Sequence, residues 1–195
     1  MFLGIDVGVK TDYAALVIGR KVSYVGKLEE IKSFEGVKAV GIDAPLSFPK
    51  KGFRQCERLL LKMGIRLFPP NAPFFKKIGI RGIEIANKFK KAGIDVFEVY
   101  PYASRVFLNI APKAKKALKS GREEILNALS NFLEFEDVKN HNEVDAIIAA
   151  LTVKLYYEGK AIAIKGFDGH ILVPKPKDTS LQVSLNTLLE NVNDF

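Results

Sequence analysis

Three short apolar segments, far apart in the chain, each end at or next to an acidic residue. Their length and hydrophobic content are typical of buried strands, and they cover Phe2–Val7, Val37–Asp43 and Ile94–Val99. The acids are Asp6, Asp43 and Glu98. A single acid at a strand end is explained equally well as a turn former. Open α/β sheets, however, bind ligands at the carboxyl ends of their strands. The three acids together therefore predict an α/β sheet with one shared site.

The rest of the pattern predicts a mixed sheet flanked by helices. The runs Tyr13–Ile18 and Val22–Gly26 follow the first strand across short polar turns, so three antiparallel strands open the fold and parallel strands follow. Expected later elements are helices in Gly52–Gly64, around Ile83–Phe89, in Arg122–Phe135 and in Glu143–Tyr157, a loop at Phe68–Phe75, and short strands at Ile162–Ile164 and Ile171–Val173. We expect one domain over residues 1–174, with a basic insertion at about 45–93. The tail, residues 175–195, should be helical and either dock or lie at a homo-oligomer interface.

Composition bounds the class of protein. Hydrophobic residues make up 48% of the chain, but the longest apolar stretches, such as Ala146–Leu151, are too short to span a bilayer. No export signal is visible, and the single Cys56 cannot form an internal disulfide. These features favour a cytoplasmic protein that does not enter the membrane.

Positive charge is concentrated in the middle of the chain. The net charge is +8, yet Lys50–Lys119 alone holds 17 Lys and Arg against four Asp and Glu. Clustered cations attract nucleic acid, although a lysine-rich face can also serve solubility alone. The candidate phosphate contacts are Arg54, Arg58, Arg66, Lys76, Lys77 and Arg81.

Phe68, Phe74 and Phe75 lie in the same basic region. Such rings can stack on unpaired bases, but packing in the core is the interpretation that the sequence favours.

A fourth acid, Asp145, lies in the first turn of a strongly apolar predicted helix. An ionised carboxylate at the edge of a packed face needs a counter-charge or a metal ion. Asn142 and His141 precede it by three and four residues and can share its helix face, as further ligands or as supports for the ligands. Carboxylate oxygens without thiolates or clustered imidazoles suit Mg²⁺ or Mn²⁺ rather than zinc.

Six segments in order along the chain resemble the domain-of-unknown-function family numbered 429. They are Gly4–Asp6, Gly41–Leu46, Arg54–Glu57, Glu98–Pro101, His141–Ala146 and Gly166–Ile171, and the likeness extends from Phe2 to about Pro174. The resemblance implies a ribonuclease H-like fold and a predicted nuclease. The placement of Asp6, Asp43 and Asp145 is also similar to the Holliday-junction resolvase branch of that superfamily. This chain has Asn142 where those resolvases have a further acid, which removes one charge.

The leading hypothesis is a divalent-metal nuclease that hydrolyses phosphodiester bonds in DNA or RNA. Asp6, Asp43 and Asp145 would hold the metal, and Glu98 would be a fourth ligand or a base. The alternative is a nucleic-acid-binding protein without catalysis. An actin-like phosphotransferase is a third reading, because Gly4–Gly8 followed by Thr11 resembles a phosphate-binding hairpin, but the chain is too short for two such domains.

Overall fold

A five-stranded mixed sheet forms the centre of the protein in the computed structural model, which describes residues 1–190. The strand order is β3-β2-β1-β4-β5. The strands are β1 (Phe2–Asp6), β2 (Tyr13–Ile18), β3 (Lys21–Lys27), β4 (Ala39–Asp43) and β5 (Asp95–Glu98). The first three pair antiparallel, whereas β1, β4 and β5 run parallel. This confirms the predicted α/β class with a mixed sheet of antiparallel and parallel strands.

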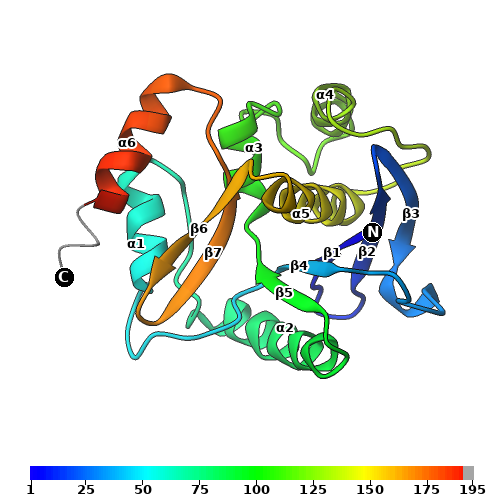
Figure 1. Ribbon diagram of the computed structural model, residues 1–195, viewed down its shortest axis with the longest axis horizontal. Coiled ribbons are helices and arrows are strands. Elements are labelled where there is room, and N and C mark those ends of the chain that lie inside the picture. Colours follow the sequence, from blue (N-terminus) through cyan, green and yellow to red (C-terminus); the bar gives the residue numbers. More distant parts are fainter. Residues whose placement is uncertain (191–195) are drawn as a thin grey trace.

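Two long helices cover the two faces of this sheet. Helix α5 (His141–Tyr157) packs on one face and α2 (Pro73–Lys91) on the other (Figure 1). Side chains alternate along a strand, so Leu3 and Ile5 of β1 enter the core beneath α2, while Gly4 between them faces α5. Twelve of the residues of α5 are buried, which explains its nearly continuous apolar sequence.

Helix α5 lies unusually close to the sheet because glycines face it. Gly4 and Gly41 are paired in register on β1 and β4. A Cβ atom on Gly4 would lie 2.0 Å from the backbone oxygen of Ala146, and one on Gly41 would lie 2.8 Å from that of Ala149. Side chains at these positions would push the helix away. The same glycines therefore bring the start of α5 down to the residues that follow them on β1 and β4.

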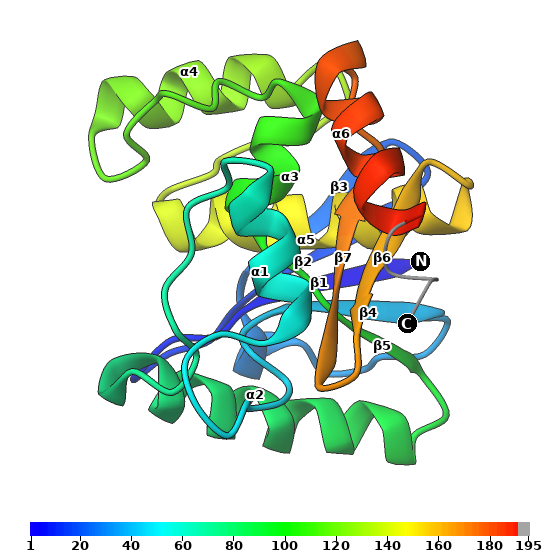
Figure 2. The ribbon, with the colours of Figure 1, turned by 90° about the vertical axis from the view of Figure 1, so that its left-hand side faces the viewer.

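A second group of elements lies together beside the sheet (Figures 1 and 2). A separate hairpin of β6 (Ala161–Gly166) and β7 (Gly169–Pro174) packs against α1 (Gln55–Lys62) and α3 (Pro101–Leu108). Helix α6 (Thr179–Glu190) buries Leu185 in the same apolar cluster. Helix α6 covers part of the tail for which a helix was expected, while residues 191–195 of that expectation lie outside the described residues. The last two elements are a short 3-10 helix, η1 (Leu28–Glu30), and α4 (Lys119–Leu129).

Local details differ from the sequence expectations at three helices. Helix α3 is absent from the expected elements. A proline after a strand is consistent with a turn, but its fixed φ also suits the first helical position, which Pro101 occupies. Pro73 starts α2 in the same way, so Phe74 and Phe75 are helical rather than in a loop. Helix α4 ends at Leu129, because the chain then turns back and Glu134 bridges to Lys21 of β3. Among residues 1–190, no helix combines the length and the apolar character needed to cross a bilayer.

Candidate metal centre

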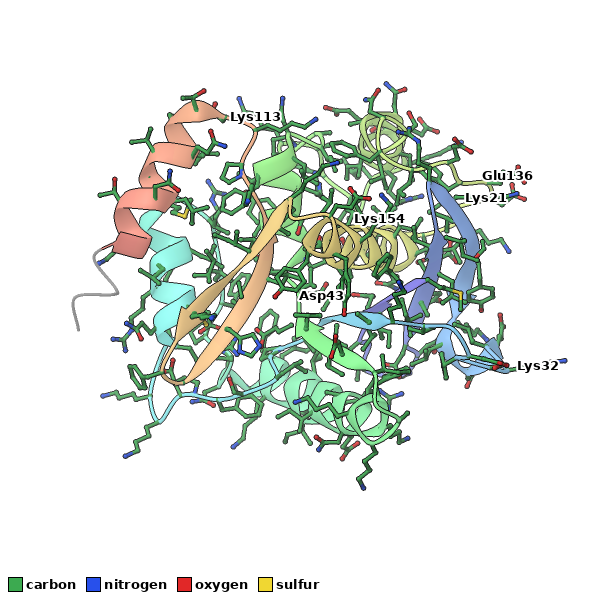
Figure 3. The ribbon with its side chains drawn as sticks, viewed as in Figure 1. Lys21, Lys32, Asp43, Lys113, Glu136 and Lys154 are labelled. Carbon is green, nitrogen blue, oxygen red and sulfur yellow. The ribbon has the colours of Figure 1, made fainter. Side chains whose placement is uncertain are left out.

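Three acids from distant parts of the chain meet at the carboxyl end of the parallel strands. Asp6 and Asp43 are neighbours in the β1–β4 register, and the first turns of α5 add Asp145. Each offers a carboxylate oxygen, and these oxygens all lie within 4.8 Å of one another. Figure 3 shows Asp43 in the middle of the molecule, next to β4, β5 and α5. The structure thus brings together three of the four acids singled out in the sequence.

The crowding of these carboxyls disfavours their charged forms. Burial, followed by the negative charge of Asp145, raises the pKa of Asp6 to about 7. Burial and then the charge of Asp6 raise the pKa of Asp43 well above its usual range, and burial also raises the pKa of Asp145. Three neighbouring acids become fully ionised only when a cation offsets their repulsion. Hard oxygen donors at this spacing fit Mg²⁺ or Mn²⁺, so the residues present suit the ion that the sequence predicted.

A lysine that the sequence did not single out supplies one positive charge to the cluster. Lys116 lies in the irregular segment between α3 and α4 and donates a hydrogen bond to the carboxylate of Asp145. The buried Arg105 holds this segment in place by donating to the carbonyls of Ile110 and Ala114, at 3.2 and 3.0 Å. Several lysines surround Lys116 in the sequence, and nothing in their spacing indicates which one turns inward.

The two residues expected to support Asp145 both lie near the acids. Asn142 and Asp6 line the same cavity. His141 lies close enough to lower the pKa of Asp145, after the larger effects of burial, Lys116 and Arg105. The side chain of Asn140 caps the helix by accepting hydrogen bonds from the backbone N–H groups of Asn142 and Glu143, and this fixes the first turn that carries Asp145.

Glu98 is held by an arginine rather than by the acidic cluster. The Nη1 atom of Arg54 donates to Oε2 of Glu98 at 2.7 Å, and its Nη2 atom donates to Oε1 of Glu57 at 2.8 Å. The backbone N–H of Leu46 also donates to Glu98 at 2.8 Å. Arg54 also donates to Oε1 of Glu98, so both oxygens of this carboxylate accept hydrogen bonds within the protein. Glu98 lines the same cavity as the three acids but is not in the group whose ligand atoms lie within 4.8 Å of one another, so its role as a fourth ligand or a base stays a prediction.

Arg54 is fully buried, with 0% of its surface exposed, and is paired with Glu57 and Glu98, which argues against the expectation that it contacts phosphate. Its guanidinium joins the segment after β4 to β5 and α1. The β6–β7 turn is connected to Arg54 through Ser47. The Ser47 hydroxyl accepts a hydrogen bond from Arg54 at 3.0 Å and donates one to the backbone oxygen of Asp168 at 2.7 Å. The Asp168 side chain accepts the first N–H of α1, from Gln55, at 2.9 Å. Two of the segments that resemble the family therefore interlock with each other.

The other candidate phosphate contacts differ in their surroundings. Arg58, Arg66, Lys76 and Lys77 are exposed. Arg81 is partly exposed and forms a two-pronged pair with Asp12, with a shortest contact of 2.7 Å. Asp12 also accepts the N–H of Gly8, so a carboxylate occupies the β1–β2 turn that the phosphotransferase reading assigned to phosphate. The N–H of Gly8 therefore donates to a carboxylate of the protein itself, where that reading requires a phosphate oxygen.

Two cavities, each of about 500 Å³, open on either side of Asp6. The first cavity contains all three acids. Its other walls include Phe68, Phe75, Tyr100, Tyr102, Lys115 and Lys116. The second is lined by the β1–β2 turn together with Phe74, Ile78 and Asn142. Phe68 and Phe74 are 68% and 57% exposed, so the interpretation that they pack in the core is wrong. They form part of the walls around the acids instead.

The free energy of unfolding of the metal-free protein is expected to fall as the pH rises from about 4 to about 7. The pKa of Asp6 lies near 3.8 in the unfolded chain and at about 7 in the folded protein. The folded state therefore binds more protons in this window, and each pH unit costs about 1 kcal/mol of stability. Urea unfolding in EDTA should show a steeper decline for the wild type than for Asp6→Asn, and Mg²⁺ should reduce the difference. Parallel pH profiles would contradict this assignment.

The mixed sheet and the acids at neighbouring strand ends define an α/β domain with a cluster that could bind a metal ion. The chain belongs to the family described as "Protein of unknown function (DUF429)", whose model matches residues 4–168. Among solved structures, the RuvC structure from Thermus thermophilus is similar with a TM-score of 0.44 and 13% sequence identity, over 80% of this chain and 94% of that one. No curated protein matches this sequence.

Proposed function

We propose that this protein is a divalent-metal-dependent nuclease that hydrolyses phosphodiester bonds in nucleic acid. The single observation that carries the proposal is the convergence of Asp6, Asp43 and Asp145, with ligand atoms within 4.8 Å, at the wall of a cavity. Phosphodiester hydrolysis needs little protein chemistry beyond carboxylates that hold hard cations near the reacting phosphate.

The roles of the three acids follow from their positions. Asp6 is the register partner of Asp43, and the charge of Asp145 acts on both of these carboxyls. Asp6 also borders both cavities, so it is the best placed to share its two oxygens between cation positions. A bound Mg²⁺ or Mn²⁺ would supply a polarised phosphate oxygen and an activated water.

The cationic residues near the acids complete the proposed site. Lys115 and Lys116 line the cavity that contains the acids, and the exposed Arg66, Lys76 and Lys77 lie in the segment that supplies its aromatic wall. Positive charge here attracts a polyanion, while the acids alone would repel it. We therefore assign Lys116 to charge balance in the metal-free protein and the exposed cations to phosphate contacts.

The experiment is a cleavage assay on labelled DNA and RNA, single-stranded and duplex, with Mg²⁺, Mn²⁺ or EDTA. Cleavage that requires the cation is expected. Calorimetric titration of Mn²⁺ into the protein measures cation uptake independently of any substrate. Nucleic-acid binding without cleavage and without Mn²⁺ uptake would instead identify the non-catalytic binding protein, which is the alternative that the basic middle of the chain favours.

A further inference from the structure

Exposed aromatic rings surround the acidic cluster in an arrangement that the hydrolytic chemistry does not require. The planes of Phe68 and Phe75 stack at 16° with ring centres 5.3 Å apart, and Phe74 meets the edge of Phe75 at 5.4 Å. Phe68 and Phe74 leave most of their surface exposed, and with Phe75 they form a contiguous aromatic patch, which is typical of an interaction site. Each of the two cavities that flank Asp6 includes at least one of these rings.

The cavity that contains all three acids has the size and walls of a site for one nucleotide. Its volume is about 500 Å³, within the usual range for small-molecule sites. Phe68, Phe75, Tyr100 and Tyr102 provide flat apolar walls, and Lys115 adds a cation. Aromatic rings stack on nucleobases of any sequence, because every base has a π-face.

We infer that the site takes an unpaired strand, with one nucleobase inserted between the aromatic walls and its phosphate at the acids. This inference rests on the proposed nuclease function and names its substrate class. A base-paired nucleotide has both faces covered by its neighbours and its pairing edge occupied, so it must leave the helix before it can enter such a cavity. Single-stranded DNA or RNA avoids that cost.

Binding of oligonucleotides measures this preference directly. Anisotropy of a fluorescein-labelled 12-nucleotide single strand is compared with that of its duplex in Ca²⁺, which suits oxygen ligands, and each oligonucleotide is checked on a gel to be intact. The single strand should bind about tenfold more tightly or better. A 2-aminopurine base within it should change its fluorescence on binding, as expected when a base leaves its stack.

Phe68→Ala provides the test of the aromatic wall, because an exposed side chain can be removed without loss of the fold. We expect this variant to bind the single strand about tenfold more weakly, and Phe68→Trp to restore binding. Phe167→Ala is the matched control, since Phe167 is 90% exposed at the β6–β7 turn and lines neither cavity. Duplex binding equal to single-strand binding, or unchanged binding by Phe68→Ala, would overturn the inference. Mn²⁺ uptake by calorimetry reports on the proposed function separately, because it involves no base.

Discussion

Asp43→Asn is expected to lower metal-dependent cleavage about 1000-fold and to abolish tight Mn²⁺ uptake. Asp43 supplies one of three converging carboxylates, so its loss removes both a ligand atom and a negative charge from the cluster. Cleavage rates with saturating Mn²⁺, together with calorimetry, measure the two effects.

The same substitution should raise the free energy of unfolding of the metal-free protein near pH 7.5. Burial and the neighbouring Asp6 raise the pKa of Asp43 well above its usual range, so its ionised form opposes folding and a neutral amide relieves that cost. A variant that is inactive because it misfolds would lose stability instead, and this difference in sign separates the two explanations. Asp137→Asn is the control, because Asp137 is exposed and has a left-handed backbone that Asn tolerates. Full activity in Asp43→Asn would exclude the acidic cluster as the site of cleavage.

Arg54→Ala is expected to lower the free energy of unfolding by about 3 to 5 kcal/mol. The guanidinium is the buried partner of both Glu57 and Glu98, and its removal leaves two carboxylates without a counter-charge. Burial already raises the pKa of Glu98, despite Arg54, so the loss should be larger at neutral than at acidic pH. Urea denaturation followed by circular dichroism measures it.

Arg58→Ala is the matched control for this prediction. Arg58 lies in α1, four residues after Arg54, and is exposed, so the same substitution should change the unfolding free energy by about 0.5 kcal/mol or less. If Arg58 contacts phosphate, its loss should weaken nucleic-acid binding while stability is kept. Equal stability of the two variants would show that the Arg54 network contributes little to the fold.

The main lines of the fold could be predicted from the sequence because they depend on local patterns. Apolar runs that end at or next to Asp6 and Asp43 predicted two buried strands, which pair in the structure, and the apolar run after Asp145 predicted the buried helix α5. The family resemblance is confirmed by the match of the family model to residues 4–168. Helix α3 was missed, because a proline after a strand is equally consistent with a turn or with the first residue of a helix.

The acidic cluster was predictable for a geometric reason, and the partners of Glu98 and Asp145 were not. Parallel strands that end in acids must place them at one edge of the sheet, so the sequence by itself determined where a metal could bind. Only the tertiary structure decided that Arg54 is buried and pairs with Glu98, that Lys116 pairs with Asp145, and that Phe68 is exposed to solvent. The local pattern determines the face on which a side chain lies. The residue with which that side chain pairs depends on distances between segments that are remote in sequence. These distances are set by packing, such as the close contact of Gly4 with α5.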